Sequence, residues 1–113
     1  MIARRLAVAV LFVLAVALVA LPAPATAENG AKIFAQSCAP CHGKEGAPNA
    51  VFAKQGVRSF KDQAWQKAAS DAQVEKSIRE GKKDTMMPSF EKQFSAEEMK
   101  GLVAYVRKLG RAK

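Results

Sequence analysis

Aromatic residues and histidine are scarce in this sequence. Its 113 residues include one Trp, one Tyr, six Phe, one His and two Cys. A domain of this size buries only about 60–65 % of the surface of its unfolded chain, and such domains usually need a disulfide, a metal or a cofactor. Cys38 and Cys41 are three positions apart, so a disulfide between them would close a very small loop and contribute little. The sequence therefore predicts a bound group.

Alternation between apolar and polar residues, the pattern of a half-buried strand, is also missing. The sequence contains neither internal repeats nor a low-complexity tract. Apolar residues at helical spacing instead predict an all-α fold with three to five helices. We expect residues 43–59 to be mostly loop, because glycine and proline interrupt them. The expected helices lie at 29–38, 60–69, 70–80 and 95–109.

Residues at the expected helix ends carry signals of their own. Ser70 with Gln73, and Ser95 with Glu98, have the spacing of capping boxes. In this motif each side chain bonds the backbone of the other residue, which fixes where the helix starts. The remaining signals are an N-cap at Asn29, a hydrophobic staple of Phe94 with Met99, and helix ends at Gly81 and Gly110.

The long hydrophobic run lies at the N-terminus. Sixteen apolar residues, 6–21, follow Arg4 and Arg5 and precede an Ala-Thr-Ala tripeptide that ends at Ala27. A basic start, an apolar middle and an Ala-x-Ala end are typical of a secretory signal peptide. A retained membrane anchor is the alternative, but a spanning helix needs roughly 18–20 apolar residues. We expect cleavage after Ala27, which leaves a periplasmic domain at 28–113 without a membrane span.

Both cysteines and the single histidine lie in one segment, Cys-Ala-Pro-Cys-His at 38–42. This is the Cys-x-x-Cys-His pattern of covalent haem attachment. Residues three apart share one side of a helical turn, so Cys38 and Cys41 can each form a thioether with one vinyl group of the same haem. His42 can then bind the iron. The segment predicts one covalently bound haem c.

Two other interpretations of this segment are a redox-active dithiol and a structural zinc site. A thioredoxin-like dithiol belongs beside strands, which this sequence does not predict, and it makes no use of His42. A structural zinc site takes four ligands, commonly from two separated pairs, and this chain has three Cys and His residues in all. Haem attachment accounts for the whole segment.

The second axial ligand of the iron has to be another residue type, because His42 is the single histidine. Met1 lies in the leader, and Met99 is explained by the hydrophobic staple. Met86 and Met87 remain as candidates. The alternatives are that both methionines fill core space, or that the iron keeps an open or water-filled position.

Over nearly all of residues 28–113 the sequence resembles the single-haem class I cytochromes c. The resemblance implies an all-α fold in which the first and last helices cross and a haem lies in a crevice. Members of that family carry single electrons between redox proteins outside the cytoplasm. The residues that carry the resemblance are Gly30, Phe34, Cys38, Cys41, His42, Ile78, Gly81, Met87-Pro88 and Tyr105-Val106.

The resemblance also implies roles for two prolines. The family's distal ligand directly precedes a proline, which favours Met87, followed by Pro88, over Met86. A proline carbonyl orients the proximal histidine in that family, and Pro48 is the corresponding candidate here.

Basic residues exceed acidic ones in the expected mature chain. Without Arg4 and Arg5 there remain 16 Lys and Arg against 10 Asp and Glu, a net charge of +6. An exported chain without a recognition motif is not expected to bind nucleic acid. The charge favours redox partner proteins with acidic docking surfaces, although scattered charge also serves solubility. Lys82 and Lys83, near the two candidate methionines, are the first candidates for that contact.

We therefore expect an exported monomer that carries electrons and is not an enzyme. Two other functions agree with the same residues. One is a haem subunit of a larger oxidoreductase complex. The other is a haem protein with five-coordinate iron that binds peroxide or nitric oxide.

Overall fold

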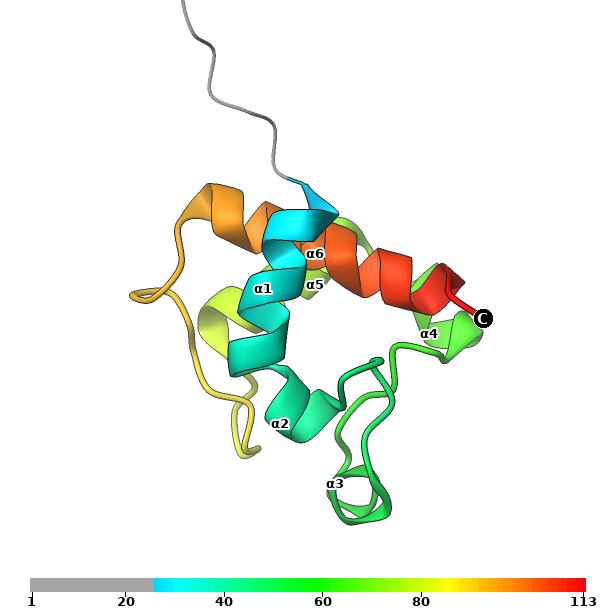
Figure 1. Ribbon diagram of the computed structural model, residues 1–113. Helices are drawn as coiled ribbons and strands as arrows, with labels where there is room; N and C mark the ends of the chain where they lie inside the picture. The colour runs from blue at the N-terminus through cyan, green and yellow to red at the C-terminus, as the bar shows by residue number, and fades with distance from the viewer. Residues whose placement is uncertain (1–25) are drawn as a thin grey trace, which may run out of the picture.

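The computed structural model describes residues 26–113, which form helices and no strands (Figure 1). This confirms the all-α prediction. The expected signal peptide falls almost entirely on residues 1–25, outside the described residues. No helix within 26–113 combines the length and apolar character needed to cross a membrane. The helices are α1 (Ala27–Ser37), α2 (Ala39–His42), α3 (Ala50–Lys54), α4 (Gln63–Ala68), α5 (Asp71–Glu80) and α6 (Ala96–Arg111).

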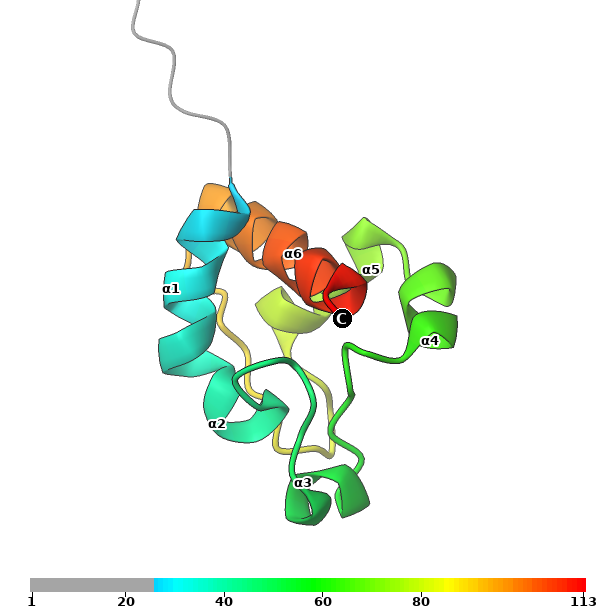
Figure 2. The same ribbon diagram turned by 45° about the vertical axis from the view of Figure 1, so that its right-hand side comes forward.

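The first and last helices, α1 and α6, cross and pack together, as the resemblance implied (Figures 1 and 2). Two glycines stand at the crossing. A Cβ on Gly30 would overlap the carbonyl of Gly101, and a Cβ on Gly101 would lie 3.0 Å from the carbonyl oxygen of Thr26. Glycine at both positions lets the two backbones touch. The crossing therefore depends on the absence of two side chains.

The core follows one face of α6. The apolar stripe of this helix is buried, with Leu102 only 1 % exposed, and Phe34 of α1 is buried to the same extent. Burying an aliphatic or aromatic side chain of this size contributes roughly 1.5–3 kcal/mol, so this face is the main source of packing energy. The buried hydrophobic residues are Phe34, Phe60, Val74, Ile78, Phe90, Met99, Leu102, Val103, Val106 and Leu109.

Both predicted capping boxes are confirmed. The Gln73 N–H donates to Ser70 Oγ at 3.1 Å, and the Ser70 N–H donates to Gln73 Oε1 at 2.8 Å. At the start of α6 the corresponding distances between Ser95 and Glu98 are 3.1 and 3.0 Å. Gly81 follows α5 with a φ of 72°, a conformation that favours glycine.

Three predicted helix boundaries were wrong. Thr26, not Asn29, caps α1, since the Asn29 N–H donates to Thr26 Oγ1 at 3.3 Å. The helix predicted from residue 60 begins only at Gln63, because the Asp62 carboxylate caps α4. Gly110 lies inside α6 rather than ending it, and a Cβ there would overlap the Gln66 side chain. This glycine provides space and does not stop the helix.

Two single-turn helices raise the number of helices above the expected three to five. They are α2, with four residues, and α3, with five. The second lies in the segment expected to be mostly loop. Asn49 starts it, because its Oδ1 accepts a hydrogen bond from the Phe52 N–H at 3.0 Å. An asparagine cap stabilises a turn without the apolar periodicity of a longer helix, so the pattern gave no signal for it.

Candidate haem site

The Cys-x-x-Cys-His segment forms a helical turn that continues from α1. Cys38 ends α1 and begins α2, and its N–H donates to the Phe34 carbonyl at 2.9 Å. The Cys38 carbonyl accepts from the N–H groups of Cys41, at 3.2 Å, and His42, at 2.8 Å. Both thiols are free and half-buried. The turn therefore places two unpaired thiols three residues apart, with an imidazole next to them, as covalent haem attachment requires.

His42 is oriented by the segment that precedes α4. Its Nδ1 lies 3.0 Å from the carbonyl oxygen of Arg58. When Nδ1 carries the proton and donates this bond, Nε2 keeps its lone pair for a metal. The imidazole also stacks on the Phe60 ring, with centroids 4.6 Å apart and planes 18° from parallel.

The expected role of the Pro48 carbonyl was wrong, because the structure gives this bond to Arg58. The Phe60 N–H donates to the Gly46 carbonyl at 2.7 Å. That bond brings residues 58–60 alongside the haem-attachment segment. Sequence reasoning missed Arg58 because a backbone carbonyl carries no residue-type signal.

Burial sets the protonation of two groups in this segment. It lowers the pKa of His42, and the hydrogen bond to Arg58 partly opposes that shift. The neutral imidazole is the form that binds a metal. Burial, followed by the neighbouring Cys41, raises the pKa of the free Cys38 thiol to about 11. Redox-active dithiols instead have thiols of lowered pKa, so this environment argues against the dithiol interpretation.

Aromatic rings form the apolar surroundings of His42. Besides stacking on the imidazole, Phe60 contacts Phe34 edge-on at 6.1 Å and Trp65 at 5.3 Å between centroids. Phe34 in turn meets Tyr105 edge-on at 5.1 Å. These contacts join α1, α4 and α6 around the haem-attachment segment. Four of the eight aromatic residues of the chain thus lie together near His42.

The two candidate methionines lie on a loop of residues 81–90, here called the methionine loop. The Lys82 N–H donates to the Met87 carbonyl at 3.0 Å, and the Phe90 N–H donates to the Ile78 carbonyl at 3.1 Å. A Cβ on Gly81 would lie 2.7 Å from the Met87 carbonyl oxygen. The loop is therefore held closely against the end of α5, and it passes beside α2 in both views (Figures 1 and 2).

The methionine loop gives its two methionines different environments. Met87 is half-buried and packs against the hydrophobic core, as Cys38 does. Met86 is 63 % exposed. Thr85 Oγ1 accepts from the Met87 N–H at 3.2 Å, and the neighbouring Asp84 has a φ of 60°. This tight turn holds the Met87 side chain toward the core.

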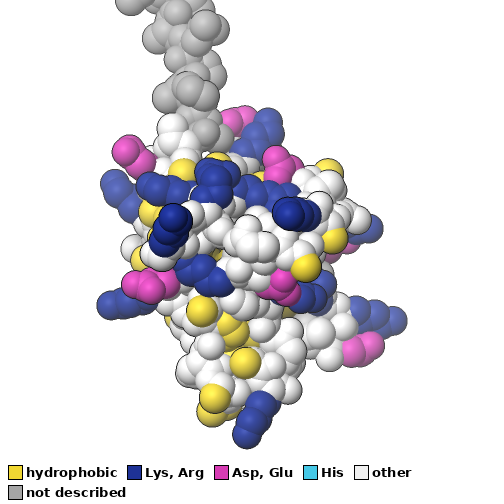
Figure 3. Space-filling view, turned by 90° about the vertical axis from the view of Figure 1, so that its right-hand side faces the viewer, with side chains coloured by type: hydrophobic (Ala, Val, Ile, Leu, Met, Phe, Trp, Pro, Cys, Tyr) yellow, Lys and Arg dark blue, Asp and Glu magenta, His cyan; other side chains and the backbone are white. Residues whose placement is uncertain are grey.

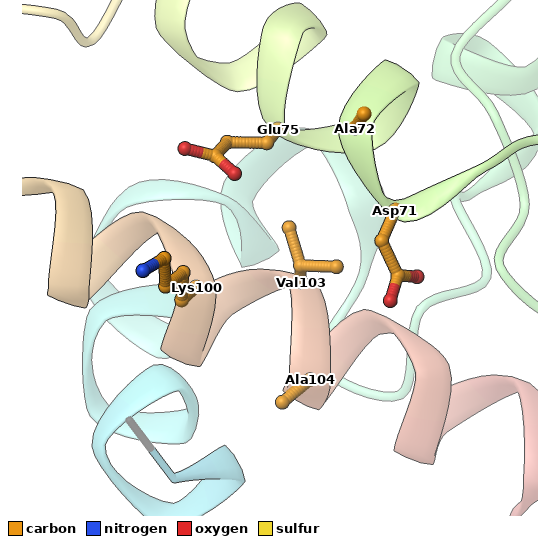
Figure 4. Close-up of a pocket in the computed structure, with 6 residues that line it drawn as sticks. All are labelled: Asp71, Ala72, Glu75, Lys100, Val103 and Ala104. Atoms are coloured by element: carbon orange, nitrogen blue, oxygen red, sulfur yellow. The ribbon is translucent and has the colours of Figure 1, made fainter. Parts of the chain in front are cut away.

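A groove between α5 and α6 does not include the haem-attachment segment. Figure 4 shows its lining, with Val103 between the two helices. Its charged groups already have partners: Asp71 pairs with Arg107 at 2.8 Å, Glu75 with Arg79 at 3.5 Å and Lys100 with Glu97 at 3.4 Å. The groove therefore offers no free charged group for a cofactor. Its lining residues are Asp71, Ala72, Glu75, Lys100, Val103 and Ala104.

The fold is shared with a solved c-type cytochrome. The KustC0563 c-type cytochrome superposes with a TM-score of 0.66 and 38 % sequence identity, over 71 % of this chain and 95 % of that one. A mutant of the same protein gives a TM-score of 0.65. Together with the free thiols and the available His42 nitrogen, this likeness identifies a single-haem c-type cytochrome. Its cofactor is a covalently bound haem c with its iron, which the residues present fit.

The family is more specific than this class. A family model described as "Cytochrome C oxidase, cbb3-type, subunit III" matches residues 25–106. The chain belongs to this family.

Curated relatives of the chain are also subunits of cbb3-type cytochrome c oxidases. The cbb3-type cytochrome c oxidase subunit FixP of Azorhizobium caulinodans is 33 % identical over 74 % of this chain. The protein of the same name from Bradyrhizobium diazoefficiens is 30 % identical over 77 % of it. The matched part covers only 27 % and 29 % of these two relatives.

Proposed function

We propose that this protein is an exported electron carrier that passes single electrons between redox proteins and catalyses no reaction of its own. The bound haem supplies an iron that changes between the ferrous and ferric states. The observation that carries the proposal is the bond from His42 Nδ1 to the Arg58 carbonyl, because it leaves Nε2 available to the iron. The haem-attachment turn supplies the two thioether positions beside it.

In this proposal Met87 is the distal ligand. It is half-buried against the core, whereas Met86 is largely exposed to solvent. If His42 and Met87 both hold the iron, they would leave no position for peroxide or nitric oxide. Ligation by Met and His also favours a high reduction potential, which suits a carrier that accepts electrons.

The exposed side of the methionine loop is the proposed docking surface. Lys82 and Lys83 are exposed there, together with Met86. On the face shown in Figure 3, basic side chains are spread widely, and apolar side chains gather toward the end where α3 and its exposed Val51 lie. At the methionine loop, the exposed Met86 beside Lys82 and Lys83 suits weak docking to an acidic protein surface.

The second candidate is a haem-carrying subunit that stays assembled in an oxidase complex. The names of the curated relatives favour it, since both FixP proteins are oxidase subunits. The two candidates differ in the size of the native particle. A free carrier elutes from a size-exclusion column in a native extract as a small monomer, and a subunit elutes with its complex.

The attachment and export steps are tested by mass spectrometry of the protein after denaturation and acid–acetone extraction. We expect a chain that starts at Glu28 and carries the mass of one haem. A mass equal to the bare polypeptide would exclude thioethers at Cys38 and Cys41. Retention of residues 1–27 would exclude cleavage after Ala27.

A further inference from the structure

The segment that orients His42 has no helix of its own. Residues 58–60 lie between α3 and α4, and Figure 2 shows this stretch leading up toward the C-terminal end of α6. The Arg58 carbonyl lies within hydrogen-bond distance of His42 Nδ1, and the Phe60 ring stacks on the imidazole. Both contacts therefore depend on what holds an irregular stretch of backbone in place.

One side chain, that of Gln66 on α4, holds this stretch against α6. Its Nε2 donates to the carbonyl of Phe60 at 2.9 Å and to the carbonyl of Val106 at 3.1 Å. A single amide nitrogen thus ties the segment beside the histidine to the long last helix. Each of these bonds makes a modest net contribution to stability.

The other end of the Gln66 amide is fixed as well. Arg107, only 17 % exposed at its side chain, donates from Nη1 to Gln66 Oε1 at 2.8 Å. The same guanidinium bonds the carbonyl of Gln66, the carbonyl of Ala69 and, at 2.8 Å, the Asp71 carboxylate. These bonds lock the orientation of the Gln66 amide, so that its nitrogen faces the Phe60 and Val106 carbonyls.

Gly110 provides the space for this arrangement. A Cβ at this position would overlap the end of the Gln66 side chain. Glycine inside a helix is less favourable than alanine. The last turn of α6 therefore carries a less favourable residue at the point where Gln66 has to pass.

From these contacts we propose that Gln66 is a positioning residue for the proximal histidine. It holds the Phe60 carbonyl, and through it the Arg58 carbonyl and the Phe60 ring, against the His42 imidazole. The inference rests on the proposed function, in which His42 binds the iron. A firm bond from Nδ1 makes the imidazole a stronger electron donor, which stabilises ferric iron and lowers the potential. Gln66 therefore acts on the potential without touching the haem ligand.

The test uses the haem-loaded protein with three variants. Gln66→Met removes every bond made by the amide. Gln66→Glu keeps an acceptor for Arg107 but cannot donate to the two carbonyls. Gly110→Ala pushes the intact glutamine aside while it improves the helix propensity of α6. We expect all three to raise the midpoint potential.

The variants are also expected to speed the exchange of the His42 Nδ1 proton, followed by NMR in the reduced protein. Loss of the tether should increase this rate about tenfold, which corresponds to about 1.4 kcal/mol.

The matched control is Gln63→Met. Gln63 lies on the same helix and also bonds α6, at the Gly110 carbonyl, but its second bond goes to the Lys61 carbonyl. This control should leave the potential and the exchange rate near those of the wild type.

The proposal is wrong if the Gln66 variants only lower the unfolding temperature and match the control in both readouts. If Gln66→Met does not fold, Gln66→Glu and Gly110→Ala decide by the same two measurements. The proposed function itself is tested on the wild type. A wild-type spectrum without histidine ligation of the iron would contradict it, whatever the variants show.

Discussion

Neighbouring residues of this chain differ sharply in environment, and the methionine loop gives the clearest case. Met86 and Met87 are indistinguishable by residue type, yet one side chain is 63 % exposed and the other packs against the core. The turn at Asp84 and Thr85 makes the difference, because it fixes the direction in which each side chain leaves the backbone. Backbone conformation, and not residue type, therefore distinguishes the two candidate ligands.

Met87→Ala should remove the thioether–iron charge-transfer band of the oxidised protein and lower its midpoint potential, because a methionine ligand favours a high potential. The variant should also bind external ligands such as imidazole. Met86→Ala is the matched control and should keep the band. The reverse result, with the band lost only in Met86→Ala, would move the distal ligand by one residue.

Asp84→Gly should stabilise the methionine loop. Asp84 has a φ of 60°, in the left-handed region that costs about 1 kcal/mol or more for a residue with a side chain. Glycine adopts this region at no steric cost, so the thermal unfolding midpoint should rise. Asp84→Ala removes the same charge and keeps the Cβ, so it should give no rise. An equal increase in both variants would assign the effect to charge.

At the scale of helices and loops, the elements with paired end signals were predicted well. The capping boxes at Ser70 and Ser95 fix the starts of α5 and α6 through contacts within four residues of sequence. The misjudged positions have different causes. Local caps at Thr26 and Asp62 set the starts of α1 and α4, α3 is a single turn, and Gly110 depends on a long-range contact. Gly110 has the sequence signal of a helix end. Its glycine instead makes room for the side chain of Gln66, which lies 44 positions earlier in the sequence.

The site itself was predictable only in part. The thioether positions and the proximal histidine follow from one pentapeptide, and they remain predictions that the attachment experiment tests. The hydrogen bond from His42 to the Arg58 carbonyl could not be predicted, because it forms only when two segments of the chain come together in the fold. The same holds for Phe60, whose stacking on His42 no periodicity could indicate.

Gly30→Ala tests the crossing of α1 and α6. Helix propensity alone would make alanine about 1 kcal/mol more stable than glycine within a helix. The added Cβ would instead overlap the Gly101 carbonyl, so we expect a loss of about 1–3 kcal/mol in the free energy of unfolding. Chemical denaturation of the haem-loaded protein measures the sign. A gain would show that the helices can separate without cost.

At the scale of the whole molecule, basic side chains are distributed along the chain and are not confined to the proposed docking surface. Basic residues occur on loops and helices all along the described chain, and four of the five ion pairs found within it lie close in sequence. Exposed pairs of this kind contribute little to stability, about 0–1 kcal/mol each. The excess of positive charge is therefore free to act on solubility and on encounter rates.

Reversal of Lys82 and Lys83 to Glu should slow electron transfer to ferricyanide, a small anion that stands in for an acidic partner surface. In the wild type the rate should fall as ionic strength rises, because attraction is screened beyond about 10 Å at 0.1 M salt. Reversal of Lys108, in the last turn of α6, and Lys113, two residues beyond that helix, changes the net charge equally and is the control. Equal slowing by both pairs would mean that total charge matters and the methionine loop does not.

The crossing of α1 and α6 joins the two ends of the described chain, and this has a consequence for biogenesis. In the proposed export, a chain that leaves the cytoplasm N-terminus first presents Gly30 and Phe34 long before Gly101 and Leu102. The residues of α1 that belong to the core therefore cannot pack until α6 is also available, because their contacts are with residues of that last helix. During that interval residues 38–42 belong to a chain that is not yet folded. The topology therefore leaves both thiols accessible for haem attachment until the last helix packs on the first.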